Sequence, residues 1–308
     1  MKIEHVLAGF VPESRCRDGL ALAVLLARQA GARLTVAYVH PPAWTTPGPG
    51  KIDAEWQAYI AEQTAQTLEQ ARRLLAEVRD VPIDYVSHGN RGSGRGLAEL
   101  AARTDADVVV IGSAPRGGRN RISLGSTADQ LLHGSPAPVA LAPRGYGGSP
   151  PPGLRQLTVA YRRDPAAGQA VRQAVTLATQ LDVPLRLITL VVSGGRCSVV
   201  EEMMARVREQ VADDLETVAR GRWPVRAEVE VEVEVEVLEG RDVAAALTSV
   251  DWPAGAMLIC ASSQAGPLRR VFLGDVSLKI IRSAPCPVMM LPRNLQKKSK
   301  SGEKSGNT

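Results

Sequence analysis

Short apolar runs alternate with longer amphipathic stretches along most of this chain of 308 residues. Residues 106–111 (ADVVVI) have the length and valine content of a buried strand, and residues 18–29 have the alanine and leucine content of a helix, which Gly31 then ends. In the N-terminal half, these patterns predict strands at residues 5–10, 32–39, 82–86, 106–111 and 139–142 and helices at 18–29, 52–79, 94–104 and from about 126.

The C-terminal half shows the same order of patterns. Strict alternation of valine and glutamate over residues 228–237 predicts a strand with one solvated face, which belongs at a sheet edge. Strands that alternate with helices imply right-handed crossovers and an α/β fold with a parallel sheet covered on both faces. The strands expected here are 158–161, 185–192, 227–238, 257–260 and 288–291, with helices at 167–181, 199–220, 242–250 and 275–283.

An internal repeat explains this similarity of the two halves. The segment PAPVALAPR at 136–144 returns as PCPVMMLPR at 285–293, an offset of 149 residues, and the same offset carries Leu124-Gly125 onto Leu273-Gly274. Between the copies lies GYGGSPPPG, which has the composition of a linker. We therefore expect a domain at 1–144, a linker at 145–154, a second domain at 155–293, and a disordered basic tail at 294–308.

Composition narrows the classes of function. The net charge is +5, but residues 296–304 carry four lysines against one glutamate, so the body is close to neutral and no nucleic-acid partner is expected. The four cysteines have no spacing typical of a zinc site. The start of the chain has no signal region, and no apolar run is long enough to cross a membrane, so we expect a cytoplasmic protein without a membrane partner.

A glycine-rich segment follows the predicted strand at 106–111. Gly112-Ser113-Ala114-Pro115 is separated by nine residues from Gly125-Ser126-Thr127. This resembles the signature of universal stress proteins, which reads glycine, two residues, glycine, nine residues, then glycine followed by serine or threonine; here Pro115 replaces the second glycine. The resemblance covers both halves and implies two tandem Rossmann-like domains of the adenine nucleotide alpha hydrolase-like type, each with a five-stranded parallel sheet.

The resemblance also implies a ligand and its contacts. ATP, with Mg²⁺, is the candidate ligand. By position, Gly112 would lie near the ribose, and Gly125, Ser126 and Thr127 would hold the phosphates; Ser113, next to Gly112, is a further candidate contact. The physical chemistry agrees, because a glycine loop before a helix brings backbone N–H groups and a partial positive charge to an anion. Arg116, Arg119 and Arg121 are expected to neutralise the charge of the ligand.

Departures from the signature limit this expectation. Pro115 removes one N–H donor from the loop. At the end of the first strand, where similar ATP-binding proteins share an aspartate, this sequence has Gly9-Phe10. In the second half the matching positions are Ala261, Gln264, Gly274 and Asp275, and a carboxylate would repel a phosphate. A nucleotide is therefore expected in the first domain only.

The resemblance also implies how the domains associate. Related single-domain proteins dimerise through their last strands, so residues 139–141 and 288–290 are expected to pair within the chain and hide two apolar edges. Whether two tandem chains associate further into a homodimer is not decided by the sequence. No catalytic residues are predicted. The function expected is that of a stress-response or regulatory binding protein, with two alternatives: a structural or interaction protein without nucleotide, and a slow ATP hydrolase.

Overall fold

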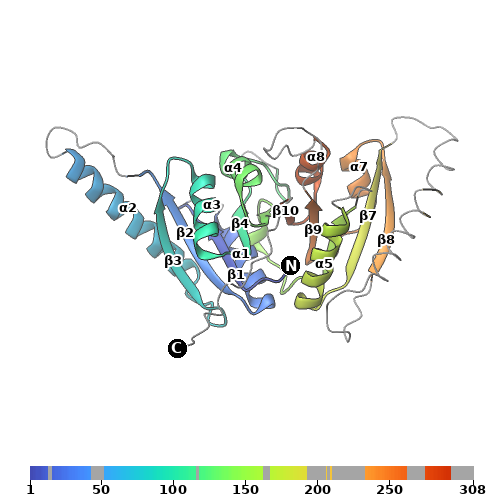
Figure 1. Cartoon of the computed structure of the whole chain (residues 1–308), viewed down its shortest axis with the longest axis horizontal. Helices are drawn as coiled ribbons and strands as arrows, with labels where there is room; N and C mark the ends of the chain where they lie inside the picture. Colours follow the sequence, from blue (N-terminus) through green and yellow to red (C-terminus); the bar gives the residue numbers. More distant parts are fainter. Residues whose placement is uncertain are drawn as a thin grey trace, which may run out of the picture.

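A computed structural model describes residues 1–12, 16–42, 52–115, 118–161, 167–192, 206, 209, 233–261 and 275–292. Within these residues the strands form one ten-stranded sheet in the order β3-β2-β1-β4-β5-β10-β9-β6-β7-β8 (Figure 1). The predicted helix at 199–220 and the predicted tail at 294–308 lie outside the described residues, apart from Arg206 and Glu209.

The first half of the sheet is parallel throughout. Its strands are β1 (His5–Gly9), β2 (Arg33–His40), β3 (Ile83–Gly89), β4 (Val108–Gly112) and β5 (Val139–Ala142). Its helices are α1 (Cys16–Ala30), α2 (Ile52–Leu74), α3 (Ser93–Thr104) and α4 (Ser126–Gly134). One buried cluster contains residues of α1 and α2 and the other contains residues of α3 and α4, so helices cover both faces as predicted.

The second half repeats this arrangement. Its strands are β6 (Gln156–Ala160), β7 (Leu185–Val192), β8 (Val233–Gly240), β9 (Ala256–Ala261) and β10 (Val288–Leu291). Its described helices are α5 (Ala167–Leu181), α7 (Val243–Thr248) and α8 (Asp275–Ser283). The described part of the predicted strand of alternating valine and glutamate is the edge strand β8, which pairs in parallel with β7; residues 227–232 of that prediction lie outside the described residues.

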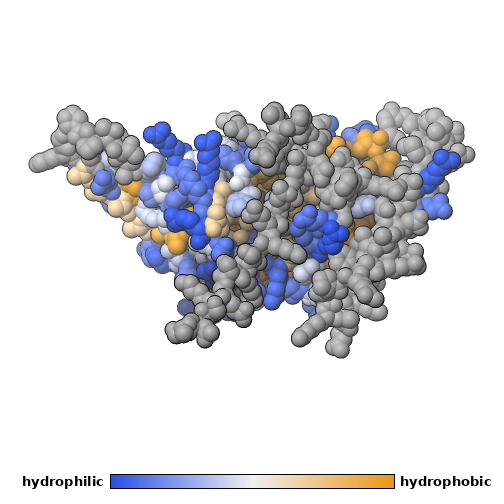
Figure 2. Space-filling model, viewed as in Figure 1, coloured by the Kyte–Doolittle hydropathy of each residue, from blue (hydrophilic) through white to orange (hydrophobic). Residues whose placement is uncertain are grey.

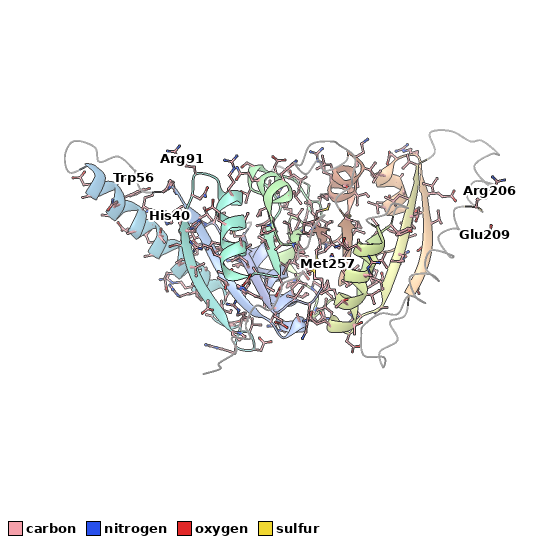
Figure 3. The ribbon with its side chains drawn as sticks, in the orientation of Figure 1. His40, Trp56, Arg91, Arg206, Glu209 and Met257 are labelled. Carbon is pink, nitrogen blue, oxygen red and sulfur yellow. The ribbon has the colours of Figure 1, made fainter. Side chains whose placement is uncertain are left out.

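The helix α2 differs from its prediction at its C-terminal end. It ends at Leu74, five residues before the expected position, and Leu75 to Glu77 form turns that lead into the segment before Pro82. Its N-terminal half extends beyond the edge of the sheet, where Trp56 stacks on Tyr59 with ring centroids 5.8 Å apart (Figures 1 and 3). In Figure 2, residues coloured as hydrophobic lie along this helix on the surface, and the side chain of Tyr59 is 53% exposed.

The two halves join through their last strands. β5 runs antiparallel to β10, with Ala140 opposite Met289 at the centre of the pairing. Both of these residues are fully buried. The pairing predicted from the sequence is therefore observed, and it merges the two parallel sheets into one because each half offers its last strand as the free edge.

A pair of glutamines holds the halves together away from this strand pairing. Gln29 of α1 accepts a hydrogen bond from the N–H of Leu154 (2.7 Å) and donates to its carbonyl (3.0 Å). Gln180 of α5 makes the same two bonds with Ile3, at 2.7 Å and 2.6 Å. The two contacts are equivalent, because each glutamine sits one residue before the end of its helix and reaches the segment before the first strand of the other half. The interface thus has an approximate two-fold symmetry.

The segment between the halves is fastened to the first domain. Asp18, which is 6% exposed, accepts hydrogen bonds from the N–H groups of Gly145 (2.9 Å) and Gly147 (2.7 Å). Residues Tyr146–Gly148 form a 3₁₀ turn, and a Cβ added to Gly147 would lie 2.7 Å from the backbone of Arg17. A short glycine-rich segment can follow α1 this closely because it has no side chains in the way. None of the helices in the described part is both long and apolar enough to span a bilayer.

Candidate functional site

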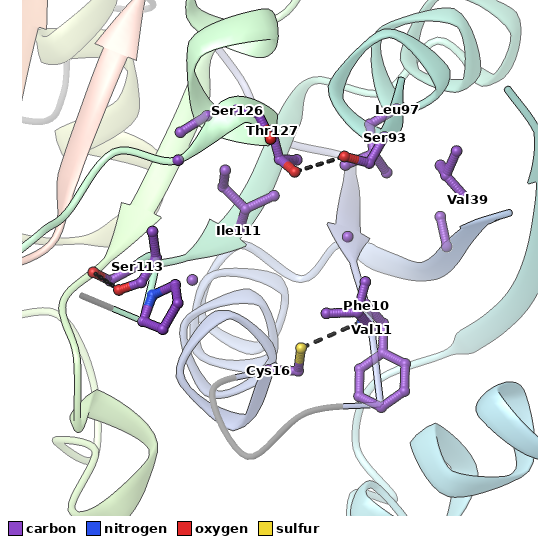
Figure 4. A pocket seen from close by; sticks show the side chains of 17 residues that line it. Phe10, Val11, Cys16, Val39, Ser93, Leu97, Ile111, Ser113, Ser126 and Thr127 are labelled. Carbon is purple, nitrogen blue, oxygen red and sulfur yellow. Dashed lines mark hydrogen bonds between the residues drawn. The ribbon is translucent and has the colours of Figure 1, made fainter. Parts of the chain in front are cut away.

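A pocket of about 360 Å³ opens at the carboxyl ends of β1 and β4 (Figure 4). These two strands are neighbours at the centre of the first half, where the strand order β3-β2-β1-β4-β5 reverses direction. In doubly wound α/β sheets this reversal point is where ligands bind, because the loops on its two sides leave the sheet in opposite directions. The pocket is therefore placed by the topology of the sheet.

The five glycine-loop residues predicted as ligand contacts, as distinct from the loop arginines, all line this one pocket. Gly112 ends β4, Ser113 follows it, Gly125 precedes α4, and Ser126 and Thr127 open that helix. Whether they bind a ligand stays a prediction. The remaining lining residues are Gly9, Phe10, Val11, Cys16, Ala37, Val39, Ser93, Leu97, Ile111, Ala114, Pro115 and Ala128.

Several helices begin at the pocket wall. α1 begins at Cys16, α3 at Ser93 and α4 at Ser126, and each of these first residues lines the pocket. A helix N-terminus carries a partial positive charge from its unpaired N–H groups. The pocket therefore favours a negatively charged group even though none of its described lining residues is charged.

The start of α4 is better suited to an anion than the start of α3. Gly125 is its N-cap, and no side chain caps the helix there; the first bond along it runs from the N–H of Asp129 to the carbonyl of Gly125, 2.9 Å away. The N–H groups of Ser126 and Thr127 precede that bond. At the start of α3, by contrast, the side-chain oxygen of Gln130 accepts from Gly94 at 3.1 Å and also from the next residue. Of these two helix starts, that of α4 is thus the better suited to an anion.

Two hydroxyl groups meet inside the pocket. Ser93 Oγ and Thr127 Oγ1 are 2.6 Å apart, so one donates to the other, and the accepting hydroxyl keeps its own proton for another acceptor (Figure 4). Ser93 was not predicted as a site residue. The available signal was a serine at the start of a helix that follows the third strand, at the same edge of the sheet as Thr127.

Ser113 holds the two arms of the glycine-rich loop together. It is 5% exposed, and its hydroxyl accepts from the N–H of Ser123 (2.8 Å) and donates to the carbonyl of Ala114 (3.2 Å). The N–H of Ala114 in turn donates to the carbonyl of Ser123 at 2.8 Å. These bonds fix the wall that carries Pro115.

The end of β1 is closed by apolar side chains. Phe10 is 2% exposed, and its N–H donates to the carbonyl of Ala37 at 2.8 Å. A Cβ added to Gly9 would lie 2.7 Å from Leu97 Cδ1, so any larger residue at that position requires Leu97 to move. This part of the pocket offers an apolar surface, where the resemblance to ATP-binding relatives would place an aspartate.

The two described arginines of the loop, Arg119 and Arg121, do not take the places expected of them. Arg121 donates from its guanidinium to the carbonyl of Ser283 in the second half, and neither Arg119 nor Arg121 lines the pocket. The expectation that Arg121 would neutralise the ligand is therefore wrong. The physical reason is that Ser283 ends α8, whose C-terminal carbonyls attract a cation. Arg116 lies outside the described residues.

The equivalent region of the second half is described only in part. Ala261 ends β9, and Asp275 is the first residue of α8, at the position that Ser126 has in α4. Gln264 and Gly274 lie outside the described residues. The prediction that this second site is degenerate stays a prediction.

Comparisons with known proteins agree with this architecture. The sequence model of the Universal stress protein family matches residues 2–143 and 153–292. The chain is 33% identical over 299 residues to universal stress protein Rv2319c of Mycobacterium tuberculosis, covering 93% of this chain and 99% of that protein, and equally similar to Mb2346c of Mycobacterium bovis.

Solved structures show the same fold. A universal stress protein from Archaeoglobus fulgidus has a TM-score of 0.62 at 17% identity, covering 96% of this chain and all of the other. A putative universal stress protein from Pseudomonas aeruginosa has a TM-score of 0.59 at 14% identity, covering 94% of this chain and 93% of the other. With both halves matched by the family and a relative similar along nearly its whole length, this chain belongs to the universal stress protein family as a tandem member with two Rossmann-like domains.

Proposed function

We propose that this protein is a cytoplasmic stress-response regulator that acts by binding, and that its first domain, residues 1–144, takes a nucleotide such as ATP with Mg²⁺ in the pocket between β1 and β4. The second domain, residues 155–293, binds none. The observation that carries this proposal is the start of α4, where Gly125 leaves the helix without a side-chain cap and where Gly125, Ser126 and Thr127 all line the pocket.

Different parts of the pocket suit the phosphates, the ribose and the base of a nucleotide. Phosphates at the start of α4 would accept hydrogen bonds from the N–H groups and hydroxyls of Ser126 and Thr127; each such bond to a charged group is worth about 1.5–3 kcal/mol. Gly112 would lie beside the ribose. The apolar side chains of Val39, Leu97 and Ile111 line the remaining wall and would contact the base.

Magnesium fits this site only together with phosphates. Mg²⁺ in proteins is commonly held by substrate phosphates, water and a few protein oxygens. The described lining residues offer hydroxyl and carbonyl oxygens but no carboxylate. The hydroxyls of Ser126 and Thr127 are therefore the protein groups that would approach the ion.

A second candidate function is that of an interaction protein that binds no nucleotide. Two observations favour it. Pro115 has no N–H, yet it stands in the pocket wall where the family signature has a glycine. Phe10 and Gly9 close the first strand without a carboxylate that could bind a ribose or base.

Calorimetric titration with ATP and Mg²⁺ distinguishes these candidates. We expect saturable binding of one nucleotide per chain, and its loss in Gly125→Val, because a Cβ at this position already lies 3.1 Å from Ala114 Cβ and the added methyl groups would enter the pocket. Gly134→Val at the other end of α4 is the matched control, since a Cβ there has no atom within 4 Å. Absence of binding by the folded wild-type chain at millimolar ATP would refute nucleotide binding.

The same samples test for hydrolysis. ADP release that disappears in Gly125→Val and persists in Gly134→Val would identify the slow ATP hydrolase. Binding without ADP release supports a regulator that senses the nucleotide.

A further inference from the structure

The loop that joins β4 to α4, residues 113–125, connects the pocket to the second domain. Its two ends, Ser113 to Pro115 and Gly125, line the pocket. Its middle part approaches the junction of the two halves, where α4 and α8 stand on the same face of the sheet on either side of β10 (Figure 1). A contact made by the middle of this loop can therefore affect both of its ends.

The middle of the loop is first held by its own domain. The N–H of Asn120 donates to the carbonyl of Arg144 (2.9 Å), and the N–H of Arg144 donates to the carbonyl of Arg121 (3.0 Å). Asn120 adopts a left-handed backbone conformation with φ of 59°, which turns the chain at this point. The loop therefore runs beside the segment that leaves β5, the strand at the domain junction.

The next two residues reach into the second domain. The guanidinium of Arg121 donates to the carbonyl of Ser283, the last residue of α8. Ile122 is 2% exposed and belongs to the same buried cluster as Ile281 and Val288 of the second domain. A cation at the C-terminal end of a helix is favourable, because unpaired carbonyl groups give that end a partial negative charge.

A short chain of bonds leads from this contact to the pocket wall. Ser123, two residues after Arg121, donates its N–H to Ser113 Oγ (2.8 Å) and accepts from the N–H of Ala114 (2.8 Å). Ser113 and Ala114 both line the pocket. Arg121 is therefore connected to the wall beside Gly125 through two residues of backbone and the bonds of Ser123.

We propose that Arg121 is a positioning residue through which the second domain braces the ligand loop of the first. This inference rests on the proposed function and extends it to regulation of the same site. It assigns a role to a domain that binds no nucleotide itself. Because coupling between two sites is reciprocal, ligand in the pocket also stabilises the C-terminal end of α8.

The first test compares ATP affinity among variants of the full chain. We expect Arg121→Ala to weaken binding of ATP with Mg²⁺ by about fivefold or more, the lower end of typical coupling between sites. Arg121→Lys should restore part of the loss, because an ammonium group can still donate to a carbonyl. Arg119→Ala is the matched control, since Arg119 is an exposed arginine of the same loop that does not line the pocket. Equal affinity of Arg121→Ala and wild type would overturn the inference.

The second test uses the unaltered chain, so it does not depend on the folding of a variant. Hydrogen exchange is measured with and without ATP and Mg²⁺. We expect the amides at the end of α8, including that of Ala284, which donates to Ile280 at 2.9 Å, to exchange more slowly when ligand is present. Binding with unchanged exchange in α8 would overturn the inference and leave the proposed function standing. No binding to the wild-type chain would overturn both.

Discussion

Replacing Ser126 by aspartate should change ligand affinity and protein stability in opposite directions. Ser126 is the exposed first residue of α4, and no side chain caps that helix. A carboxylate in the first turn interacts favourably with the helix dipole by about 0.3–1 kcal/mol. The folded protein should therefore be as stable as the wild type or slightly more stable.

The same carboxylate would stand where the phosphates are proposed to bind. Two unit charges about 4 Å apart repel each other by about 1 kcal/mol in water and about 4 kcal/mol at a partly shielded protein surface. Because Ser126 is exposed, we take the lower part of this range and add the lost hydroxyl donor. The dissociation constant for ATP should rise at least about tenfold, since about 1.4 kcal/mol corresponds to that factor.

Calorimetric titration and urea denaturation of the same preparations measure the two effects. Ser126→Asn is the neutral control of similar size, and it should lose much less affinity than the aspartate variant. Unchanged ATP binding in Ser126→Asp would show that phosphate does not lie at the start of α4. A large loss of stability would show instead that Ser126 has a structural role that the contacts do not reveal.

Other predictions concern the domain interface and the cysteines. Gln29→Leu and Gln180→Leu should each lower the free energy of unfolding by about 1–3 kcal/mol, because each leaves backbone groups of the opposite half without partners. Urea denaturation should give nearly equal losses for the two variants, and a loss confined to one of them would contradict the approximate two-fold symmetry. Burial raises the pKa of Cys260 to about 12 from 9.0, so the folded state disfavours its thiolate. The contribution of the neutral thiol to the free energy of unfolding is therefore complete below pH 9.0 and is lost as the pH rises towards about 12. Urea denaturation of wild type and Cys260→Ala across this pH range would test this. Native Cys260 should also resist thiol reagents at neutral pH, and rapid labelling without unfolding would contradict its burial.

Much of the fold could be predicted from local patterns. Within the described residues, valine-rich runs and alanine- and leucine-rich stretches predicted strands and helices in the right order, because burial on both faces of a parallel sheet demands continuous apolar strands. The repeat at 136–144 and 285–293 identified the last strands. Their pairing, which the structure shows, was implied by the resemblance to universal stress proteins, and it covers two apolar edges. The end of α2 was placed too far along the chain, since an amphipathic pattern continues through turns that follow a helix.

The candidate site was predicted in part. The glycine spacing located Gly112 and Gly125 correctly on the pocket wall, because a loop between a strand and a helix has its position fixed by both elements. Ser93 was missed, since its distance from Thr127 depends on how α3 and α4 pack against each other. Arg121 was assigned to the ligand because its partner, Ser283, is remote in sequence.

The amino-acid sequence by itself determined the element order, the duplication and the place of the glycine-rich loop, because these depend on residues near one another in the chain. Only the tertiary structure decided which helix starts converge on the pocket, where the loop arginine points, and how Gln29 and Gln180 join the halves. The contacts of Arg121, Gln29 and Gln180 join residues more than a hundred positions apart, and the helix starts at the pocket are also distant from one another along the chain. They are selected by the packing of whole helices on a shared sheet, and no local pattern in the sequence encodes that packing.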